Sequence, residues 1–273
     1  MSLSTLAELA ARVPDGAKLV VAKDESGVAM AAAFALMRRG VKNLHLVTVP
    51  VSGLQADMLI GAGCVATIET SGVTLGEFGP GPCFTRAIKS GSMTIRDATC
   101  PAIYAGLQAA QKGIPFMPLR GILETDVLAN RADWKVIDNP FVPGDRIVVL
   151  PAIVPDVALF HVPLADRFGN VFIARQRELM LLAHASRATL VTAERIVEGN
   201  LLDDEARSGS VIPALYIDAV AHAPRGAWPL AFGDDYAVDA AWMGRYAVEA
   251  KTPEGFARML ASIEEQDPAR LAA

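Results

Sequence analysis

The stretch from Met93 to Arg120 has the pattern of a strand, a turn, a helix, a second turn and a second strand. Residues 93–97 alternate apolar and polar side chains, which is the period of an extended chain. Thr99 can cap a helix, Pro101 fits its first turn, and Gly113 stands where a left-handed C-terminal cap belongs. An apolar extended run follows. The stretch therefore predicts one right-handed crossover unit of a parallel sheet.

The turn between that strand and that helix is the first candidate site. In parallel sheets, ligands bind beyond the carboxyl ends of the strands. Ala98, Thr99 and Cys100 follow the strand directly, so a substrate would arrive beside them. The alternative is a helix cap without chemistry, since most strand–helix turns in α/β domains carry none.

The composition favours parallel strands covered by helices over a β-sandwich. Apolar residues make up 52% of the 273 residues and aromatic residues only 6%, so Ala, Val and Leu fill the core. A chain of this length fits one large domain, and we expect a single α/β domain over residues 1–273. The net charge of −5, with no basic cluster, argues against nucleic acid as a partner.

The cysteines and the N-terminus predict a cytoplasmic protein without a metal site. Cys64, Cys83 and Cys100 lack the spacing of metal ligands, and so sparse a set fits a reducing compartment. Residues 1–16 resemble a short amphipathic helix ended by a turn more than a signal peptide. No apolar run reaches about 18 residues, so we expect no membrane contact.

A second strand–turn–helix unit lies near the start of the chain. An apolar strand at residues 18–22 precedes a helix at residues 28–39. The polar turn between them contains Ser26 and Gly27, placed where an anion could bind at a helix N-terminus. The turn has one glycine, whereas phosphate-binding loops usually carry several. An ordinary capping role for Asp24 or Ser26 is therefore the alternative.

A carboxylate closes the strand expected at residues 64–69. Glu69 stands at the end of that strand, the place where ligand-binding groups gather in a parallel sheet. We therefore count it among the candidate binding residues. The alternative is a solvated or lysine-paired carboxylate.

The rest of the chain alternates extended and helical patterns around one irregular stretch. Residues 121–145 contain Pro and Gly breaks but also apolar side chains that need burial, so we interpret them as an excursion and not a domain linker. The other expected elements are strands at 43–49, 146–152, 157–162 and 188–193, a hairpin loop at 166–171, a helix at 178–186 and a helical hairpin at 242–261.

No short catalytic motif assigns a reaction. The chain has no GxSxG elbow, phosphate-binding loop, GxGxxG fingerprint or HExxH sequence. Its four histidines are scattered, and a lone histidine in an apolar strand, such as His45, is more often a hydrogen-bonded core residue than a ligand. Cys100 would need a base and an orienting partner to act as a nucleophile. The residues alone therefore indicate an α/β domain with a site near Cys100.

Three segments in a fixed order carry a resemblance to a known family. They are residues 105–118, residues 157–171, and residues 193–197 followed by Pro213. Together they resemble the α-subunit of class I coenzyme A transferases of the glutaconate CoA-transferase type. The corresponding chain of an actinobacterial steroid-ring hydrolase shares that scaffold and is also similar. The match covers nearly the whole chain and implies the CoA-transferase (NagB/RpiA-like) architecture.

The resemblance implies a two-subunit enzyme, a hetero-oligomer with its site between α and β subunits. In the family, a β-subunit glutamate attacks the acyl-CoA and becomes a glutamyl-CoA thioester, so this chain would supply no catalytic residue. Coenzyme A would be a substrate, with no tightly bound cofactor and no metal. The residues expected to bind the acyl-CoA and the carboxylic acid are Thr99, Cys100, Ser26, Gly27 and Glu69.

The sequence departs from the family at two places. The α-subunits usually carry a glycine-rich loop after the first strand, whereas residues 22–27 here contain one glycine. The turn residue is often Gln or Glu, and here it is Cys100. A thiol is a weak hydrogen-bond donor, so backbone N–H groups would polarise the thioester carbonyl or the chemistry has changed.

We therefore expect the α subunit of a catabolic enzyme that transfers CoA between an acyl-CoA thioester and a carboxylic acid. The alternative is a hydrolase or carbon–carbon lyase on the same scaffold, acting on a cyclic, steroid-ring-derived CoA thioester. A third hypothesis is a degenerate regulatory or structural subunit without chemistry of its own.

Overall fold

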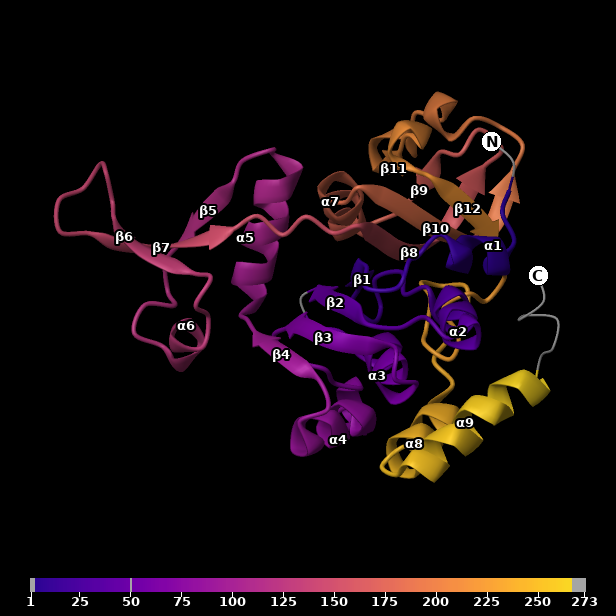
Figure 1. Ribbon diagram of the computed structural model, residues 1–273. Helices are drawn as coiled ribbons and strands as arrows, with labels where there is room; N and C mark the ends of the chain where they lie inside the picture. The colour runs from indigo at the N-terminus through magenta and orange to yellow at the C-terminus, as the bar shows by residue number, and fades with distance from the viewer. Residues whose placement is uncertain (1–2, 50, 267–273) are drawn as a thin grey trace.

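The structure is a computed structural model that describes residues 3–49 and 51–266. A nine-stranded, mostly parallel sheet lies at its centre with helices on both faces, and a three-stranded sheet projects to one side (Figure 1). The strands of the large sheet are β1 Lys18–Ala22, β2 Leu44–Val49, β3 Val65–Thr70, β4 Thr94–Asp97, β8 Val157–Asp166, β9 Val171–Phe172, β10 Ala188–Val197, β11 Val211–Ile212 and β12 Ala219–His222. The expected α/β class is confirmed.

The parallel strands follow the order β12-β10-β8-β1-β2-β3-β4. β9 pairs antiparallel with the far end of β8, and β11 pairs antiparallel with β9. The loop between β8 and β9 is the hairpin expected at residues 166–171. Because all the parallel strands run the same way, their carboxyl ends share one edge of the sheet.

Alternating side chains give the sheet two apolar faces. Leu19 and Val21 of β1 join one core cluster, whereas Val20 and Ala22 join the other, as the two-residue period of a strand requires. Helices that contribute to the first cluster are α1 Leu6–Ala11, α2 Met30–Arg39, α3 Leu54–Gly61, α4 Pro82–Ser90, α8 Ala240–Glu249 and α9 Pro253–Gln266. Helices α5 Cys100–Gln111 and α7 Arg177–Ala185 cover the other face.

The helix predicted after the first candidate site is α5. The Thr99 hydroxyl caps it by accepting from the Ala102 amide at 3.4 Å, and Gly113 follows its end at a φ of +66°. The expected terminal helical hairpin is also present as α8 and α9. Short 3-10 turns complete the chain: η1 Gly76–Phe78, η2 Leu201–Asp203, η3 Ser208–Ser210 and η4 Ala214–Tyr216.

The second strand of the predicted crossover unit does not join the parallel sheet, so that prediction is wrong. β5 (Phe116–Leu119) pairs antiparallel with β7 (Arg146–Pro151), which also pairs with β6 (Lys135–Asp138). Pairing with β7 lets Met117 and Leu119 pack against the apolar cluster under α5, and Pro118 is tolerated because β5 is an edge strand. A local pattern specifies an extended segment, but packing selects its partner.

The three-stranded sheet and helix α6 (Asp126–Ala129) together form a projection that we call the arm, residues 114–151. In Figure 1 the arm extends beyond β4 and α5, on the side away from β12. The excursion expected at residues 121–145 thus holds α6 and β6. None of the described helices is long and apolar enough to cross a membrane.

Candidate functional site

The loops at the carboxyl edge of the sheet carry most of the candidate residues. Residues 23–29 follow β1, residues 71–74 follow β3, and residues 98–99 lead from β4 into α5. The structure shows which of these side chains meet and which remain apart.

Cys100 meets a hydroxyl group that the sequence did not single out. Its Sγ atom lies 3.2 Å from the Oγ atom of Ser71, at the end of the neighbouring strand β3. The Ala98 amide donates to the Thr70 carbonyl at 3.0 Å, which continues the pairing of β3 and β4 to this point. Ser71, Thr99 and Cys100 are all half-buried or close to it. The edge therefore presents two small polar groups at the start of α5.

A buried pair of threonines holds the turn that presents Ser71. Thr48 Oγ1 donates to Thr70 Oγ1 at 2.6 Å. The Thr70 hydroxyl in turn donates to the Gly72 carbonyl at 2.8 Å and accepts from the Gly72 amide at 2.9 Å. These bonds fix the backbone on both sides of Ser71 and limit its freedom to move away from Cys100.

Ser26 and Gly27 lie against β8 and not beside the Ser71–Cys100 pair. Both residues are buried, and the Gly27 carbonyl accepts from the His161 amide at 2.7 Å. Gly27 has a φ of +87°, and a Cβ atom there would lie 2.3 Å from the His161 carbonyl oxygen. Only glycine fits this contact. β2 separates β1 from β3, so these two candidates are a strand away from the pair.

Asp24 is a cap, but of a different helix from the one expected. Its Oδ2 atom accepts from the amide of Leu54, the first residue of α3, at 3.2 Å. Its Oδ1 atom is buried without a hydrogen-bond partner. Burial raises the pKa of Asp24 to about 6, against the lowering effect of the Leu54 and Gly53 amides. Asp24 also lines a pocket of about 550 Å³ with Ser52 and Thr74.

A buried histidine and glutamate form a second polar centre near the same edge. His161 Nε2 lies 2.9 Å from Glu194 Oε1, and His161 Nδ1 lies 2.8 Å from the Thr192 hydroxyl. Tyr236 donates to Glu194 Oε1 at 2.6 Å, and the Arg225 amide donates to Oε2 at 2.7 Å. Both ring nitrogens of His161 are thus occupied, which favours a supporting role over proton transfer to a substrate.

The environment of Glu194 explains its charge state. Burial acts to raise the pKa of Glu194, but hydrogen bonds from His161 and Tyr236 outweigh it and hold the pKa below its usual value. Burial, together with the bond to Glu194, raises the pKa of Tyr236. A pocket of about 520 Å³ lies above this centre, lined by His161, Phe232 and Arg195 among others.

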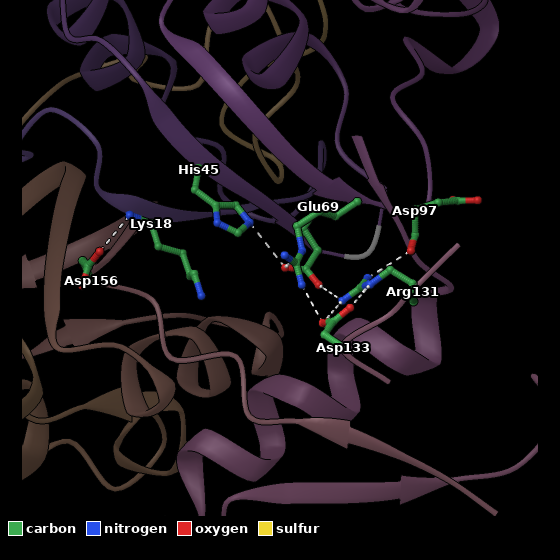
Figure 2. A network of polar contacts seen from close by, with 8 residues as sticks. Lys18, His45, Glu69, Asp97, Arg131, Asp133 and Asp156 are labelled. Atoms are coloured by element: carbon green, nitrogen blue, oxygen red, sulfur yellow. Dashed lines mark hydrogen bonds and ion pairs between the residues drawn. The ribbon is translucent and has the colours of Figure 1, made fainter. Parts of the chain in front are cut away.

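Glu69 stands on the α5 face of the sheet, in an ionic cluster shown in Figure 2. Its side chain is 4% exposed, and Oε1 accepts from Arg131 Nη2 at 2.7 Å. The expected alternative of a solvated or lysine-paired carboxylate is wrong, because the partner is an arginine from the arm. Burial acts to raise the pKa of Glu69, but His45 and Arg131 outweigh it and lower the pKa.

Sequence reasoning thus identified Cys100 and Glu69 but not their partners. Ser71 lies 29 residues from Cys100, and Arg131 lies 62 residues from Glu69. His161 and Glu194 lay inside segments that carried the family resemblance, and this was the available signal for them. Among the described residues, no three His, Cys, Asp or Glu side chains are grouped so that they could hold a metal ion.

Curated relatives are similar over most of the chain. The α chain of glutaconate CoA-transferase from Acidaminococcus fermentans is 32% identical over 83% of this chain and 75% of its own length. The cholesterol ring-cleaving hydrolase IpdA subunit of Rhodococcus jostii is 29% identical over 85% of this chain and 81% of its own. An uncharacterized protein of Archaeoglobus fulgidus is 31% identical over 84% of this chain, which spans about half (51%) of that relative.

Solved structures share the fold over nearly the whole chain. Glutaconate coenzyme A-transferase from A. fermentans superposes with a TM-score of 0.88 and 26% identity, over 96% of this chain and 88% of that one. A cysteine-to-serine variant of the decarboxylase AibA/AibB gives a TM-score of 0.85 and 28% identity, over 97% and 98%. The sequence profile of the family described as coenzyme A transferase matches residues 3–223. The protein therefore belongs to the coenzyme A transferase family.

Proposed function

We propose that this chain is the α subunit of a two-subunit enzyme that transfers CoA between an acyl-CoA thioester and a carboxylic acid. The observation that carries the proposal is the Ser71–Cys100 pair at the carboxyl edge of the sheet, on a scaffold similar to the corresponding chains of named CoA-transferases. We place the enzyme in a catabolic route in the cytoplasm.

The pair offers polarising groups and no nucleophilic carboxylate. Glu69, the nearest acid along β3, has Oε1 bound to Arg131 and lies on the α5 face. Asp97 directs its carboxylate away from the cluster in Figure 2, and its carbonyl accepts from Arg131. A carboxylate from a partner subunit would complete the centre, consistent with the glutamate that the family resemblance implies.

The reaction then divides between two chains. The partner's carboxylate attacks the thioester carbonyl carbon, and the partner's glutamate becomes the glutamyl-CoA thioester when the first acid leaves. The second acid takes up the CoA and regenerates the carboxylate. The Ser71 hydroxyl and the start of α5 would stabilise the negative charge that develops on the carbonyl oxygen. Thr99, Ser26 and Gly27 would shape the loops around the acyl-CoA.

The test is to co-express the chain with its candidate partner, a reading frame of about 250 residues, and to assay the complex. We expect acyl-CoA:acetate transfer and a CoA-sized mass adduct on a glutamate of the partner. Omitting acetate is the control, since the adduct should then accumulate. No transfer with a broad panel of acids would refute the proposal.

A second function is supported by the names of two similar proteins, a decarboxylase and the subunit of a ring-cleaving hydrolase. Cys100 at the turn, in place of the usual Gln or Glu, fits a change of chemistry on the same scaffold. Release of free CoA, or of a ring-opened or decarboxylated product, without any acceptor acid would support this alternative.

A further inference from the structure

A cavity of about 380 Å³ lies between the large sheet and α5, and neither Ser71 nor Cys100 lines it. One side of its wall is apolar and includes Ile103, Leu150 and Ile153. The other side is charged and consists of Lys18, His45, Glu69, Arg96, Arg131 and Asp133. The site is therefore distinct from the proposed thioester site and does not depend on that proposal.

The strand register explains why the charged residues gather. Lys18 of β1 is paired with His45 of β2, and Glu69 of β3 is paired with Arg96 of β4. His45 is paired with Thr67, two residues before Glu69, so all four strands present a polar group on the same face. In Figure 2 the Lys18 side chain extends from β1 into the space beside His45 and Glu69.

Arg131 and Asp133 are fully engaged by the cluster itself. Arg131 donates to Glu69 at 2.7 Å, to both carboxylate oxygens of Asp133 at 2.9 and 3.0 Å, and to the Asp97 carbonyl at 3.0 Å. Its ring contact with Trp134, at 4.2 Å from the centroid, fixes the guanidinium further. These contacts build a rigid wall and do not depend on a ligand.

Several donors of the cluster remain without a hydrogen bond. His45 Nε2 lies 3.4 Å from Glu69 Oε2 and Arg96 Nε lies 3.8 Å from it, and both nitrogens are buried without a hydrogen-bond partner. Among the described residues, Lys18 Nζ has neither a hydrogen bond nor an ion pair. Buried donors without acceptors are rare in native proteins, because they lose water without replacement.

The charges around the cavity also favour an anion. Lys18, Arg96 and Arg131 carry three positive charges, and Glu69 and Asp133 carry two negative ones, which leaves one positive charge before His45 is counted. Asp156 does not change this balance inside the cavity. It accepts from the Lys18 main-chain amide at 2.8 Å, pairs with Arg187 at 3.5 Å, and does not line the cavity.

We propose that this cavity binds a small organic carboxylate. The carboxylate group would accept from Lys18, His45 and Arg96, and a short apolar chain would lie against Ile103, Leu150 and Ile153. The volume of 380 Å³ corresponds to roughly a dozen water molecules, enough for an acid of about six carbons. Inorganic phosphate would satisfy the donors but would leave the apolar wall against water.

The test is calorimetric titration of the full chain with hexanoate and, separately, with inorganic phosphate. We expect saturable hexanoate binding and at least ten-fold weaker phosphate binding. Lys18→Gln should weaken hexanoate binding at least ten-fold, whereas the control Lys89→Gln, on α4, should leave it unchanged. Ala102→Leu, which fills the cavity from α5 without removing a charge, should also abolish binding.

Two further results would overturn the proposal. If Cys100→Ala abolishes hexanoate binding while Lys18→Gln preserves it, the acid binds at the thioester site. If phosphate binds as tightly as hexanoate, the site does not recognise an organic acid. Thermal unfolding of each variant shows whether it is folded, and the two independent cavity variants keep the result interpretable if one of them is not.

Discussion

Glu69 and Ser71 lie two residues apart on the same chain segment but in opposite environments. Glu69 is 4% exposed and held by an arginine, whereas Ser71 is half-buried in a turn and meets one thiol. A buried charge without its partner is strongly destabilising, while a neutral hydroxyl at an edge costs little to remove. The difference teaches that β3 serves stability at one position and the proposed chemistry at the next loop.

The largest expected effect is the loss of the Glu69 partner. Arg131→Met should lower the free energy of unfolding by about 3–5 kcal/mol, because Glu69 is left buried and charged. Urea denaturation measures the change. The control is Arg207→Met, which breaks an exposed pair with Asp204 at 3.5 Å and should change stability by less than about 1 kcal/mol. Equal losses in the two variants would remove the distinction between Glu69 and Ser71.

The next effect concerns Ser71 and should appear in activity. In the assembled enzyme, Ser71→Ala should reduce kcat/KM roughly 100-fold, the usual result of removing one donor to a developing oxyanion. The free energy of unfolding should change by less than about 1 kcal/mol. Ser92→Ala, at an exposed position, is the matched control. A large stability loss with unchanged activity would assign Ser71 to the scaffold.

The third prediction tests whether the second polar centre behaves like Glu69. Glu194→Gln places an amide NH₂ group where the carboxylate accepts from His161, Tyr236 and the Arg225 amide. We expect a loss of about 1–3 kcal/mol, since at least one buried donor loses its acceptor. Glu205→Gln, on the surface, should be neutral. An unchanged unfolding curve for Glu194→Gln would contradict this view.

The smallest effect is a difference in pH dependence between two buried acids. The pKa of Glu69 is below 4.5, so its stabilisation is present above about pH 4.5 and is lost as the pH falls through the folded pKa. Asp24 has a pKa raised from 3.8 to about 6, so its contribution has the opposite sign and is lost as the pH rises through about 6.

Urea unfolding at a series of pH values separates the two acids. Glu69→Gln should flatten the fall in stability on the acid side, and Asp24→Asn should flatten the fall between about pH 4 and pH 6. Parallel pH profiles for the two variants would show that the acids do not differ in this way.

Local features of the sequence predicted local structure well. The Thr99 cap, the glycine after α5, the β8–β9 hairpin and the terminal helical hairpin depend on neighbouring residues and were all found. The pairing of β5 was wrong because an extended pattern does not name its partner strand. Pro118 in β5 was a usable warning, since proline favours an edge strand.

The candidate site was predictable in part. Cys100 followed from its position after a strand, but Ser71 requires knowledge that β3 and β4 are neighbours. The ionic cluster left a signal that was not used: Lys18, His45, Glu69 and Arg96 are each polar residues in a strand of the same sheet. Aligning those strands by their apolar residues would have placed all four on one face.

The arm supplies Arg131, which neutralises a carboxylate of the central sheet, and this couples the history of the two regions. A lineage that shortened residues 121–145 would strand Glu69 in the interior unless it replaced that acid in the same step. Deletions in this excursion should therefore be accompanied among descendants by an uncharged residue at position 69.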